Sequence, residues 1–508
     1  SLSLIAKEKA CFNPQAACTP EECDMARGHY DRLPAARSTM FDEDAWTRES
    51  VAAVAQRFRV CPFEFSLDLA LWADLVVCDY NYAFDPKAYL RRFFSEGTGD
   101  YTFLVDEAHN LVDRSREMFS AELCKKPFLE LRRAVKNALP SVYRSLGKIN
   151  SWMLEARKRV EAAGAPTAER TLPEEIGPLL RDFMAAAEKW LEKNLPSPFR
   201  EALLERFFEA GGFLRVAEQF DGNYAACCEA RGNDLRVRLF CIDPARQIGE
   251  ALTRCRAAVF FSATLTPLDY FQTLLASAAA QTLLLPSPFP AENLAVFVAD
   301  RLSTYYRHRD RTKTEIARMI RGLVQSCRGN YLIFFPSYQY LHMVLERFQP
   351  AEPHIDIVVQ APGMSEGHRE NFLARFETDN RRTLVGFAVM GGIFGEGIDL
   401  VGTRLSGAAI VGVGLPAVGL ERELIRDYYA EHLEQGFEYA YLYPGINRVL
   451  QAAGRVIRTE TDRGVVLLID QRYGSPHYRG LLPAEWQTVR IAEPGRLAEP
   501  LQLFWSSA

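Results

Sequence analysis

The feature that most constrains the fold is an alternation of short apolar runs with helical stretches in the C-terminal half of the chain. Beyond about residue 290, apolar runs of strand length lie at 331–335, 383–387, 408–411 and 464–469. Parallel strands need a long crossover between them, and that crossover is usually a helix. The alternation therefore predicts an α/β fold in which helices cover a parallel sheet.

Length and composition narrow the class of protein further. At 508 residues the chain has room for about three domains, each with a core of its own. Hydrophobic residues make up 48% and charged residues 25%, which excludes wholesale disorder. The formal net charge of −5 excludes a uniformly basic nucleic-acid coat. It still permits a local basic lining, which is what nucleic-acid binding requires.

Membrane insertion and a disulfide framework are both disfavoured. The nearest candidate for a membrane span, residues 405–420, contains four glycines and a proline, which indicates a buried strand with its loops. Eleven scattered cysteines are typical of a reducing compartment, so we expect a cytoplasmic protein without a membrane partner. The chain opens on Ser1-Leu2-Ser3 without Met, like the interior of a domain, and we expect a fragment.

Changes in polarity and in the spacing of apolar residues divide the chain into segments. The polar N-terminal segment holds four cysteines, and apolar runs at 74–78 and 101–105 follow it. Residues 116–215 show helical spacing without a convincing strand, which predicts a helical insertion. Apolar runs of strand length occur again at 235–242 and 257–261. The predicted boundaries give five segments: 1–62, 63–115, 116–215, 216–288 and 289–508.

Two polar motifs each follow an apolar run directly. Asp106-Glu107-Ala108-His109 comes after the run 101–105, and the Ser262-Ala263-Thr264 motif comes after the run 257–261. Ligands of parallel α/β sheets bind beyond the carboxyl ends of the strands. Adjacent carboxylates at that place suit phosphoryl transfer, with one acid holding Mg²⁺ and the other polarising water. A solvated turn is the alternative for both motifs.

Two further motifs lie near the C-terminus. Gln451, Arg455 and Arg458 are spaced so that a helix would place them on one face, where they suit a γ-phosphate. An arginine-bearing solvated helix is the alternative. A glycine-rich stretch follows the strand at 383–387 and permits close approach of the backbone to a ligand. Its candidate ligand-contacting residues are Gly395, Glu396, Gly397 and Asp399.

In this order the four motifs resemble motifs II, III, V and VI of superfamily-2 helicases. The resemblance implies two RecA-like domains that bind ATP. It assigns Mg²⁺ coordination to Asp106 and the role of catalytic base to Glu107. It also implies that His109, Ser262 and Thr264 link the ATP site to the DNA site. The γ-phosphate contacts fall to the motif VI residues, and the nucleotide contacts to Glu396 and Asp399.

The four N-terminal cysteines narrow the family. Cys11, Cys18, Cys23 and Cys61 contain no CxxC pair, and spacing alone leaves zinc, iron–sulfur and free thiols open. Four cysteines ahead of a DEAH sequence, with a helical insertion behind it, resemble the XPD/DinG family of iron–sulfur helicases. The resemblance extends over essentially the whole chain, through stretches such as 61–68, 72–82 and 103–112.

The resemblance implies a [4Fe–4S] cluster on these four cysteines and ATP-driven 5′→3′ unwinding of DNA in repair or replication. The partners it implies are single-stranded and forked DNA. The five segments become a cluster domain, the first part of helicase domain 1, an arch domain, the remainder of domain 1, and helicase domain 2. Residues 125–159 carry ten Lys or Arg against two acids, a basic lining or else one solvated helix face.

One departure separates the chain from the family. No GxxxxGK[ST] motif occurs in the 508 residues, although the family carries this phosphate-binding loop upstream of its cysteines. We therefore expect that the first strands of domain 1 are missing and that the chain alone hydrolyses no ATP. The alternatives are an iron–sulfur module that binds DNA without hydrolysing ATP, and the DNA-positioning part of a nuclease-fused effector.

Overall fold

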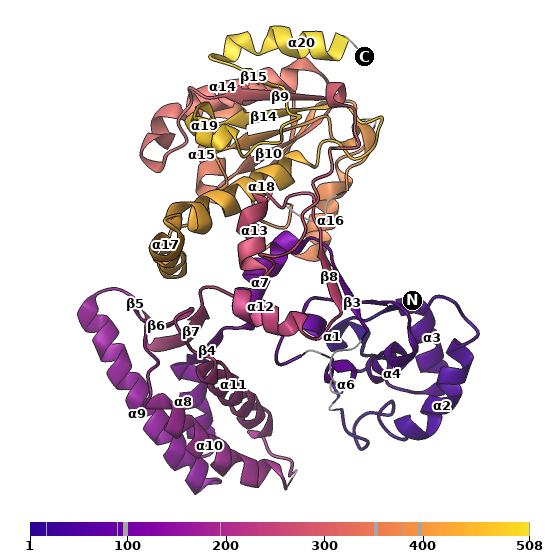
Figure 1. Cartoon of the computed structure of the whole chain (residues 1–508), viewed down its shortest axis with the longest axis vertical. Helices are drawn as coiled ribbons and strands as arrows, with labels where there is room; N and C mark the ends of the chain where they lie inside the picture. The colour runs from indigo at the N-terminus through magenta and orange to yellow at the C-terminus, as the bar shows by residue number, and fades with distance from the viewer. Residues whose placement is uncertain are drawn as a thin grey trace. The chain divides into compact units, whose positions relative to one another are not determined.

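The computed structural model describes residues 1–16, 18–88, 90–94, 100–193, 195–349, 354–378, 380–394 and 399–506. These residues divide into two compact units, whose helices and strands are labelled in Figure 1. Unit 1 comprises Ser1–Asp106 and Asn110–Phe260, and unit 2 comprises Glu107–His109 and Phe261–Ala508. Across the described part of the chain, no helix combines the length and apolar character that a membrane span needs.

Three helices build the N-terminal part of unit 1: α2 (His29–Met40), α3 (Arg48–Phe58) and α4 (Pro62–Leu69). The Thr47 hydroxyl caps α3 by accepting the Ser50 N–H at 3.2 Å. Buried apolar side chains of all three helices share one core with the parallel pair β1 (Leu2–Ser3) and β2 (Val76–Val77). The shorter helices of this part are α1 (Lys7–Ala10), η1 (Ala70–Trp72), α5 (Asn81–Phe84) and α6 (Arg91–Phe94).

Two of the predicted strands form a parallel pair in unit 1. Strand β3 (Thr102–Val105) lies beside β8 (Ala257–Phe260), with Thr102 opposite Ala257. Although the strands are far apart in sequence, both end directly before a polar motif. Their side chains are only partly covered: Leu104 is 62% exposed and Val259 is 49% exposed.

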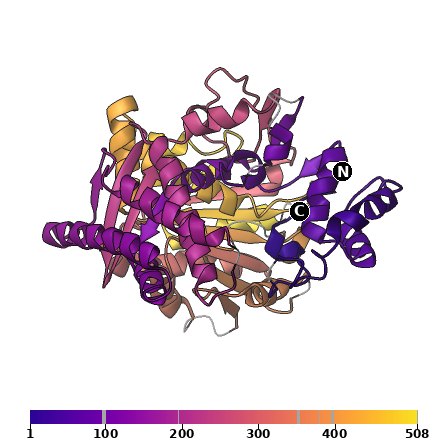
Figure 2. The ribbon, with the colours of Figure 1, turned by 90° about the horizontal axis from the view of Figure 1, so that it is seen from below.

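The region between these strands is helical, as predicted, but it also contains strands. Its long helices cross one another in both views (Figures 1 and 2). A four-stranded antiparallel sheet has the order β4-β7-β6-β5. The expectation of no strand within 116–215 is therefore wrong, because short polar strands carry no long apolar run. The elements are η2 (Ala108–Asn110), α7 (Leu111–Met118), β4 (Ala121–Cys124), α8 (Lys125–Ala134), α9 (Pro140–Ala163), β5 (Thr167–Glu169), α10 (Ile176–Leu191), α11 (Arg200–Glu218), β6 (Tyr224–Arg231), β7 (Asp234–Cys241) and α12 (Ala245–Leu252).

Unit 2 contains the predicted parallel sheet. Its seven strands have the order β11-β12-β10-β13-β14-β9-β15, and every pair in it is parallel. All four apolar runs of the sequence are strands of this sheet, so the prediction is confirmed. The strands are β9 (Leu294–Ala299), β10 (Asn330–Phe335), β11 (Asp356–Val359), β12 (Leu384–Val389), β13 (Gly407–Val411), β14 (Gly464–Ile469) and β15 (Thr488–Arg490).

Helices cover the sheet of unit 2, which explains its unbroken apolar strands. Every residue of β10, β13 and β14 is buried, as parallel strands with helices on their faces require. The connecting elements are α13 (Leu268–Leu274), η3 (Ala291–Asn293), η4 (Tyr306–His308), α14 (Arg309–Ser326), α15 (Tyr338–Phe348), α16 (Glu366–Ala374), η6 (Gly402–Arg404), α17 (Leu420–Leu433), the π-helical η7 (Glu438–Leu442), α18 (Tyr443–Ala453), η8 (Gln471–Gly474), α19 (Pro476–Arg479), η9 (Pro494–Arg496) and α20 (Ala498–Ser506).

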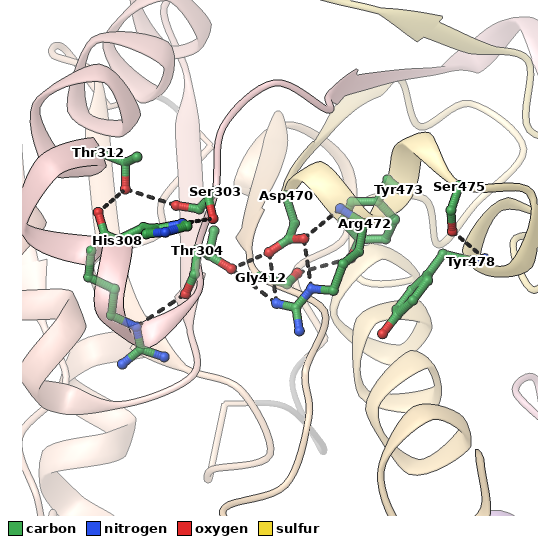
Figure 3. A network of polar contacts seen from close by, with 11 residues as sticks. Ser303, Thr304, His308, Thr312, Gly412, Asp470, Arg472, Tyr473, Ser475 and Tyr478 are labelled. Atoms are coloured by element: carbon green, nitrogen blue, oxygen red, sulfur yellow. Dashed lines mark hydrogen bonds and ion pairs between the residues drawn. The ribbon is translucent and has the colours of Figure 1, made fainter. Parts of the chain in front are cut away.

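A buried carboxylate joins the ends of two neighbouring strands (Figure 3). Asp470, fully buried, directly follows β14 and accepts the Thr304 hydroxyl from the segment after β9. Arg472 donates to Asp470 Oδ1 through its backbone N–H at 2.7 Å and Nε at 2.8 Å, and to Oδ2 through Nη2 at 2.8 Å. These bonds satisfy the buried charge and fix the carboxyl edge of the sheet.

Candidate active site

The Asp106–His109 motif begins where β3 ends. Glu107 has a positive φ of 46°, which turns the chain sharply out of the strand. The Ala108 N–H donates to the Phe261 carbonyl at 3.1 Å, so this loop is tied to the loop that follows β8. The backbone carbonyl of Asp106 accepts the Tyr80 hydroxyl at 2.5 Å. The loop geometry therefore depends on both strands of the pair.

Glu107 and His109 meet the second motif through Ser262. The Ser262 hydroxyl donates to Glu107 Oε2 at 3.0 Å and lies 2.7 Å from His109 Nδ1. Thr264 Oγ1 lies 3.4 Å from the same ring nitrogen. The imidazole is buried, at 7% exposure, whereas the Glu107 carboxylate is 56% exposed and accessible to water. The motifs that follow β3 and β8 thus form one hydrogen-bonded cluster.

The cluster holds the Glu107 carboxylate in its ionised form. The hydrogen bond with His109 lowers the pKa of Glu107 most, and partial burial opposes that effect. The Ser262 hydroxyl and the positive charge of Arg455 lower it further. Glu107 is therefore a carboxylate at neutral pH and is suited to accept a hydrogen bond from water.

Gln451 extends the cluster to a third motif. Its side-chain Nε2 contacts His109 Nε2, the ring nitrogen that faces away from Ser262. The imidazole of His109 is therefore held on both sides. Gln451 comes from α18, so residues from three predicted motifs touch within unit 2.

The shared helical face predicted for Gln451, Arg455 and Arg458 is wrong. Helix α18 ends at Ala453, and both arginines lie in the turn that follows. Glycine at position 454 is a poor helix former, and Asp462 accepts the Arg458 backbone N–H at 2.7 Å, which bends the chain. Arg455 still acts on Glu107 through its charge.

Arg458 has a different neighbour. Its Nε lies 3.8 Å from the carboxylate of Asp399, which is 75% exposed and follows the glycine-rich stretch. Arg458 and Asp399 are therefore near each other, as a common site requires. The candidate residues Gly395, Glu396 and Gly397 lie outside the described residues.

Asn447 is a contact of this site that the motifs did not indicate. It lies one helical turn before Gln451 and donates from Nδ2 to the Thr266 carbonyl at 2.7 Å and to the Tyr443 carbonyl at 2.8 Å. Its side chain is buried, at 6% exposure. The sequence signal that could have indicated Asn447 is its position as a polar residue one turn before Gln451 in a helix of mostly apolar residues.

Two of the four N-terminal cysteines, Cys11 and Cys23, accept hydrogen bonds from the same residue, Asn13. The backbone N–H of Asn13 donates to Cys11 Sγ at 3.3 Å, and its side-chain Nδ2 donates to Cys23 Sγ at 3.9 Å. Cys11 follows α1 directly, and Cys23 is buried. One residue therefore holds together two cysteines that are twelve positions apart.

The other two cysteines also have donors. A hydrogen bond with Cys18 raises the pKa of Lys7 most, burial opposes it, and the charges of Cys11 and Cys61 add to the rise. Burial raises the pKa of Cys61, which precedes α4, while hydrogen bonds from the backbone near Glu64 lower it in part. All four sulfurs thus face N–H donors.

In the part of the chain that the structure describes, the four N-terminal cysteines are not brought together into a metal-binding group. All eleven cysteines are free thiols. In the described ranges no three His, Cys, Asp or Glu side chains converge closely enough to hold one metal ion.

The basic stretch 125–159 is partly neutralised. Lys148 pairs with Asp182 of α10 at 3.3 Å, and Arg157 pairs with Glu161 on its own helix at 2.7 Å. Arg132 lies over the Tyr143 ring at 4.5 Å. Some of its cations therefore serve packing between helices rather than an open basic face.

Comparison with known proteins supports the family that the sequence resembles. The DEAD_2 model matches residues 3–128, and the model described as Helicase C-terminal domain matches residues 320–489, so together they cover more than half of the chain. A solved structure titled XPD_Helicase covers 96% of this chain and 86% of its own, with a TM-score of 0.57 at 17% identity. The chain belongs to the XPD/DinG-type superfamily-2 helicases.

The fold of this helicase chain is thereby confirmed as α/β with RecA-like domains. A second solved structure, of S. tokodaii Xpd4, has a TM-score of 0.55 at 15% identity and 82% coverage of both chains. Among curated proteins, a regulator of telomere elongation helicase 1 homolog of Drosophila melanogaster is 24% identical over 84% of the chain. The ATP-dependent DNA helicase CHL1 of Coccidioides immitis (strain RS) is 22% identical over 86%. The chain spans 52% and 59% of the lengths of these two relatives.

Proposed function

We propose that this chain is the motor region of a helicase that couples ATP hydrolysis to 5′→3′ movement on single-stranded DNA and to unwinding of forked duplexes. The observation that carries the proposal is the contact series Glu107, Ser262, His109 and Gln451, in which residues from three motifs touch. DNA repair or replication is the setting that the family suggests, and the scattered cysteines suggest the cytoplasm as the compartment.

Catalysis would begin with Asp106 and Glu107. Asp106 follows β3 and would hold Mg²⁺ bound to the phosphates of ATP. Glu107 would orient the attacking water. Because its pKa is lowered, its main contribution is to position and polarise water rather than to remove the proton completely.

The remaining residues would respond to the γ-phosphate. Arg455 already affects the charge state of Glu107, and Arg458 lies by Asp399. Guanidinium groups neutralise the charge that develops on the transferred phosphoryl group. His109 and Gln451 would transmit the change at Glu107 to α18, and Ser262 and Thr264 would transmit it to the chain after β8.

We also propose that Cys11, Cys18, Cys23 and Cys61 hold a [4Fe–4S] cluster. The support is the position of the four cysteines ahead of the Asp106–His109 motif, together with the N–H donors of Asn13 that reach Cys11 Sγ and Cys23 Sγ. When bound, such a cluster cross-links its four ligands and exchanges one electron. The protein contributes the loop after α1, the start of α4, and the donors that balance the thiolate charge.

A second function is favoured by one observation. Since no GxxxxGK[ST] motif is present in the 508 residues, the chain by itself is also compatible with an iron–sulfur module that binds DNA without hydrolysis. The two functions differ in turnover, because a phosphate-binding loop supplies the backbone N–H groups and the Lys that cradle the phosphates.

The test is DNA-stimulated ATP hydrolysis by the product of the whole reading frame that contains this chain. We expect Glu107→Gln to reduce turnover by about 100-fold or more, because a neutral amide polarises the attacking water much less than a carboxylate does. Glu431→Gln, on the exposed face of α17, is the matched control and should leave turnover unchanged. A wild-type protein without turnover above background would contradict the helicase proposal and leave the binding module, whereas equal turnover in all three proteins would overturn the role of Glu107.

A further inference from the structure

Two neighbouring tyrosines of unit 2, Tyr305 and Tyr306, present their rings to solvent in the segment that follows β9. Tyr306 is 74% exposed and Tyr305 is 38% exposed. By contrast, Tyr340 and Tyr473 of the same unit are fully buried. The two exposed rings therefore contribute little to the core of unit 2 and are accessible to a ligand.

Each of the exposed rings lies against a guanidinium group. The Arg472 guanidinium is 4.7 Å from the centre of the Tyr305 ring, and the Arg309 guanidinium is 5.5 Å from the centre of the Tyr306 ring. Such cation–π contacts hold the orientation of a ring. Because Tyr306 is mostly exposed although Arg309 lies against it, the rest of its surface faces solvent.

Buried groups fix both arginines in place. The fully buried Asp470 accepts hydrogen bonds from Nε and Nη2 of Arg472, each at 2.8 Å (Figure 3). Arg309 donates from Nε to the Thr304 carbonyl at 3.3 Å and lies 4.4 Å from the centre of the buried Tyr340 ring. The rings are thus oriented in advance and lose little conformational freedom when a ligand binds.

The segment around the rings also carries cations without acidic partners. Arg301, Arg307 and Arg311 are exposed, and among the residues that the structure describes none of the three forms an ion pair. Lys313, by contrast, pairs with Asp310 at 2.5 Å. Open guanidinium groups beside exposed rings suit a ligand that combines flat bases with phosphates. Only an unpaired strand offers its base faces, since the bases of a duplex stack on one another.

We propose that Tyr305 and Tyr306 form a stacking platform for unpaired bases of single-stranded DNA, and that the Arg307 guanidinium binds a flanking phosphate. This inference deepens the proposed function, and it rests on that function for the choice of DNA as the strand. None of the three residues belongs to the motifs that follow β3 and β8. Binding of the strand and hydrolysis of ATP can therefore be measured separately.

The test compares two fluorescent strands of about 12 nucleotides, a length within the usual site size for single strands. One is oligothymidylate, and the other is an abasic strand with the same phosphates and no bases. Fluorescence anisotropy with the product of the whole reading frame gives a Kd for each strand. Tyr306→Ala should weaken binding of oligothymidylate about ten-fold, the effect of losing one stacked base. Binding of the abasic strand should stay the same.

Three further variants make the test specific. Tyr306→Phe keeps the ring and should bind both strands as wild type does. Arg307→Ala should weaken both strands equally and reduce the salt dependence by about one released counterion. Phe208→Ala is the matched control, because that ring is also mostly exposed but is followed by an acid, Glu209. It should leave both affinities unchanged.

The outcomes separate the stacking platform from the helicase proposal. Loss of affinity in Tyr306→Ala for oligothymidylate alone, with recovery in Tyr306→Phe, supports the platform. Unchanged affinity in Tyr306→Ala would overturn it and favour a protein partner for the exposed rings. Equal losses for both strands would also overturn it, since the ring would then act through the fold, and so would a wild-type protein that binds neither strand. ATP turnover of the wild type decides the helicase proposal independently of these variants.

Discussion

The two parallel sheets that lead into the motifs differ sharply in how well they are covered. All six residues of β10 are buried in the seven-stranded sheet. In the pair β3 and β8 of unit 1, by contrast, only Val105 is buried, and Leu104 is 62% exposed. Parallel sheets are normally covered on both faces, and a two-stranded sheet is marginal in water. The polar motifs therefore follow strands of very different intrinsic stability.

The difference in burial shows which of the two sheets is stabilised by a core within its own unit. The seven-stranded sheet has a core formed by residues of its own unit, including β10, β13, β14 and the helices α14 and α15. The β3–β8 pair gains little from burial, yet it positions Glu107 and Ser262. Four experiments test this contrast.

The largest effect is expected for ATP turnover of the 508-residue chain. Its β3–β8 pair carries carboxylates at one strand end, but the sequence holds no GxxxxGK[ST] loop to bind phosphates beside them. We predict no ATP hydrolysis above background with saturating single-stranded DNA, and only weak, salt-sensitive DNA binding. A coupled-enzyme assay that finds about one turnover per second would mean that the chain binds phosphates by another loop.

The next largest effect is expected for Arg458 of unit 2. In the product of the whole reading frame, Arg458→Ala should reduce DNA-stimulated ATP hydrolysis by about 10³-fold, while nucleotide affinity changes much less. The reason is that the guanidinium acts on charge that appears only during phosphoryl transfer. Arg496→Ala, at the remote η9, is the control. Unchanged turnover would mean that Arg458 only pairs with Asp399 and does not contribute to catalysis.

A matched pair of leucines compares the two sheets directly. Leu467 of β14 is fully buried and Leu104 of β3 is 62% exposed. Leu467→Ala should lower the free energy of unfolding by about 3 kcal/mol, and Leu104→Ala by about 0.5 kcal/mol or less. Urea titration of both variants measures the difference. Equal losses would show that the β3–β8 pair is as well supported as the larger sheet.

The smallest effect is a pH dependence of unit 2. Burial by itself raises the pKa of Asp462, but hydrogen bonds from Thr459, Arg458 and Gly402 outweigh it and hold the pKa below its usual 3.8. Asp462 therefore stabilises the fold fully above the unfolded-state pKa, and that contribution is lost as pH falls through the lower folded-state pKa.

Asp462→Asn should accordingly lower the free energy of unfolding by about 1–2 kcal/mol at pH 7, since the amide cannot accept all four donated bonds. The gap between variant and wild type should close as the solution is acidified from pH 5 towards pH 3. A gap that stays constant over this range would show that the carboxylate charge contributes nothing.

Sequence alone predicted the parts of the fold in which burial dictates composition. The strands β10, β12, β13 and β14 are continuous apolar runs because helices cover both faces. The strand β15 escaped prediction because it has three residues, none of them buried. Strands β4 and β5 escaped for a similar reason: they are short and stabilised by antiparallel partners far along the chain.

For the site, the motifs predicted residue types better than geometry. The meeting of Glu107, Ser262, His109 and Gln451 agrees with the motif order, whereas the shared face of the arginines failed. Helix spacing cannot anticipate that α18 ends at Ala453, since the turn beyond it depends on Asp462, a residue eight positions past the helix cap at Gly454. The contact of Asn447 with Thr266 is likewise tertiary.

The contacts around His109 determine which ring nitrogen carries hydrogen and in which direction each hydrogen bond of the site is donated. The Ser262 hydroxyl gives its single proton to Glu107 Oε2, so it can only accept from His109 Nδ1, which must carry hydrogen. In a neutral ring, Nε2 is then bare and accepts from the Gln451 amide. Every donor in the series points towards the Glu107 carboxylate. Neutralising that carboxylate removes the terminal acceptor, and the polarity of the whole series is then free to reverse.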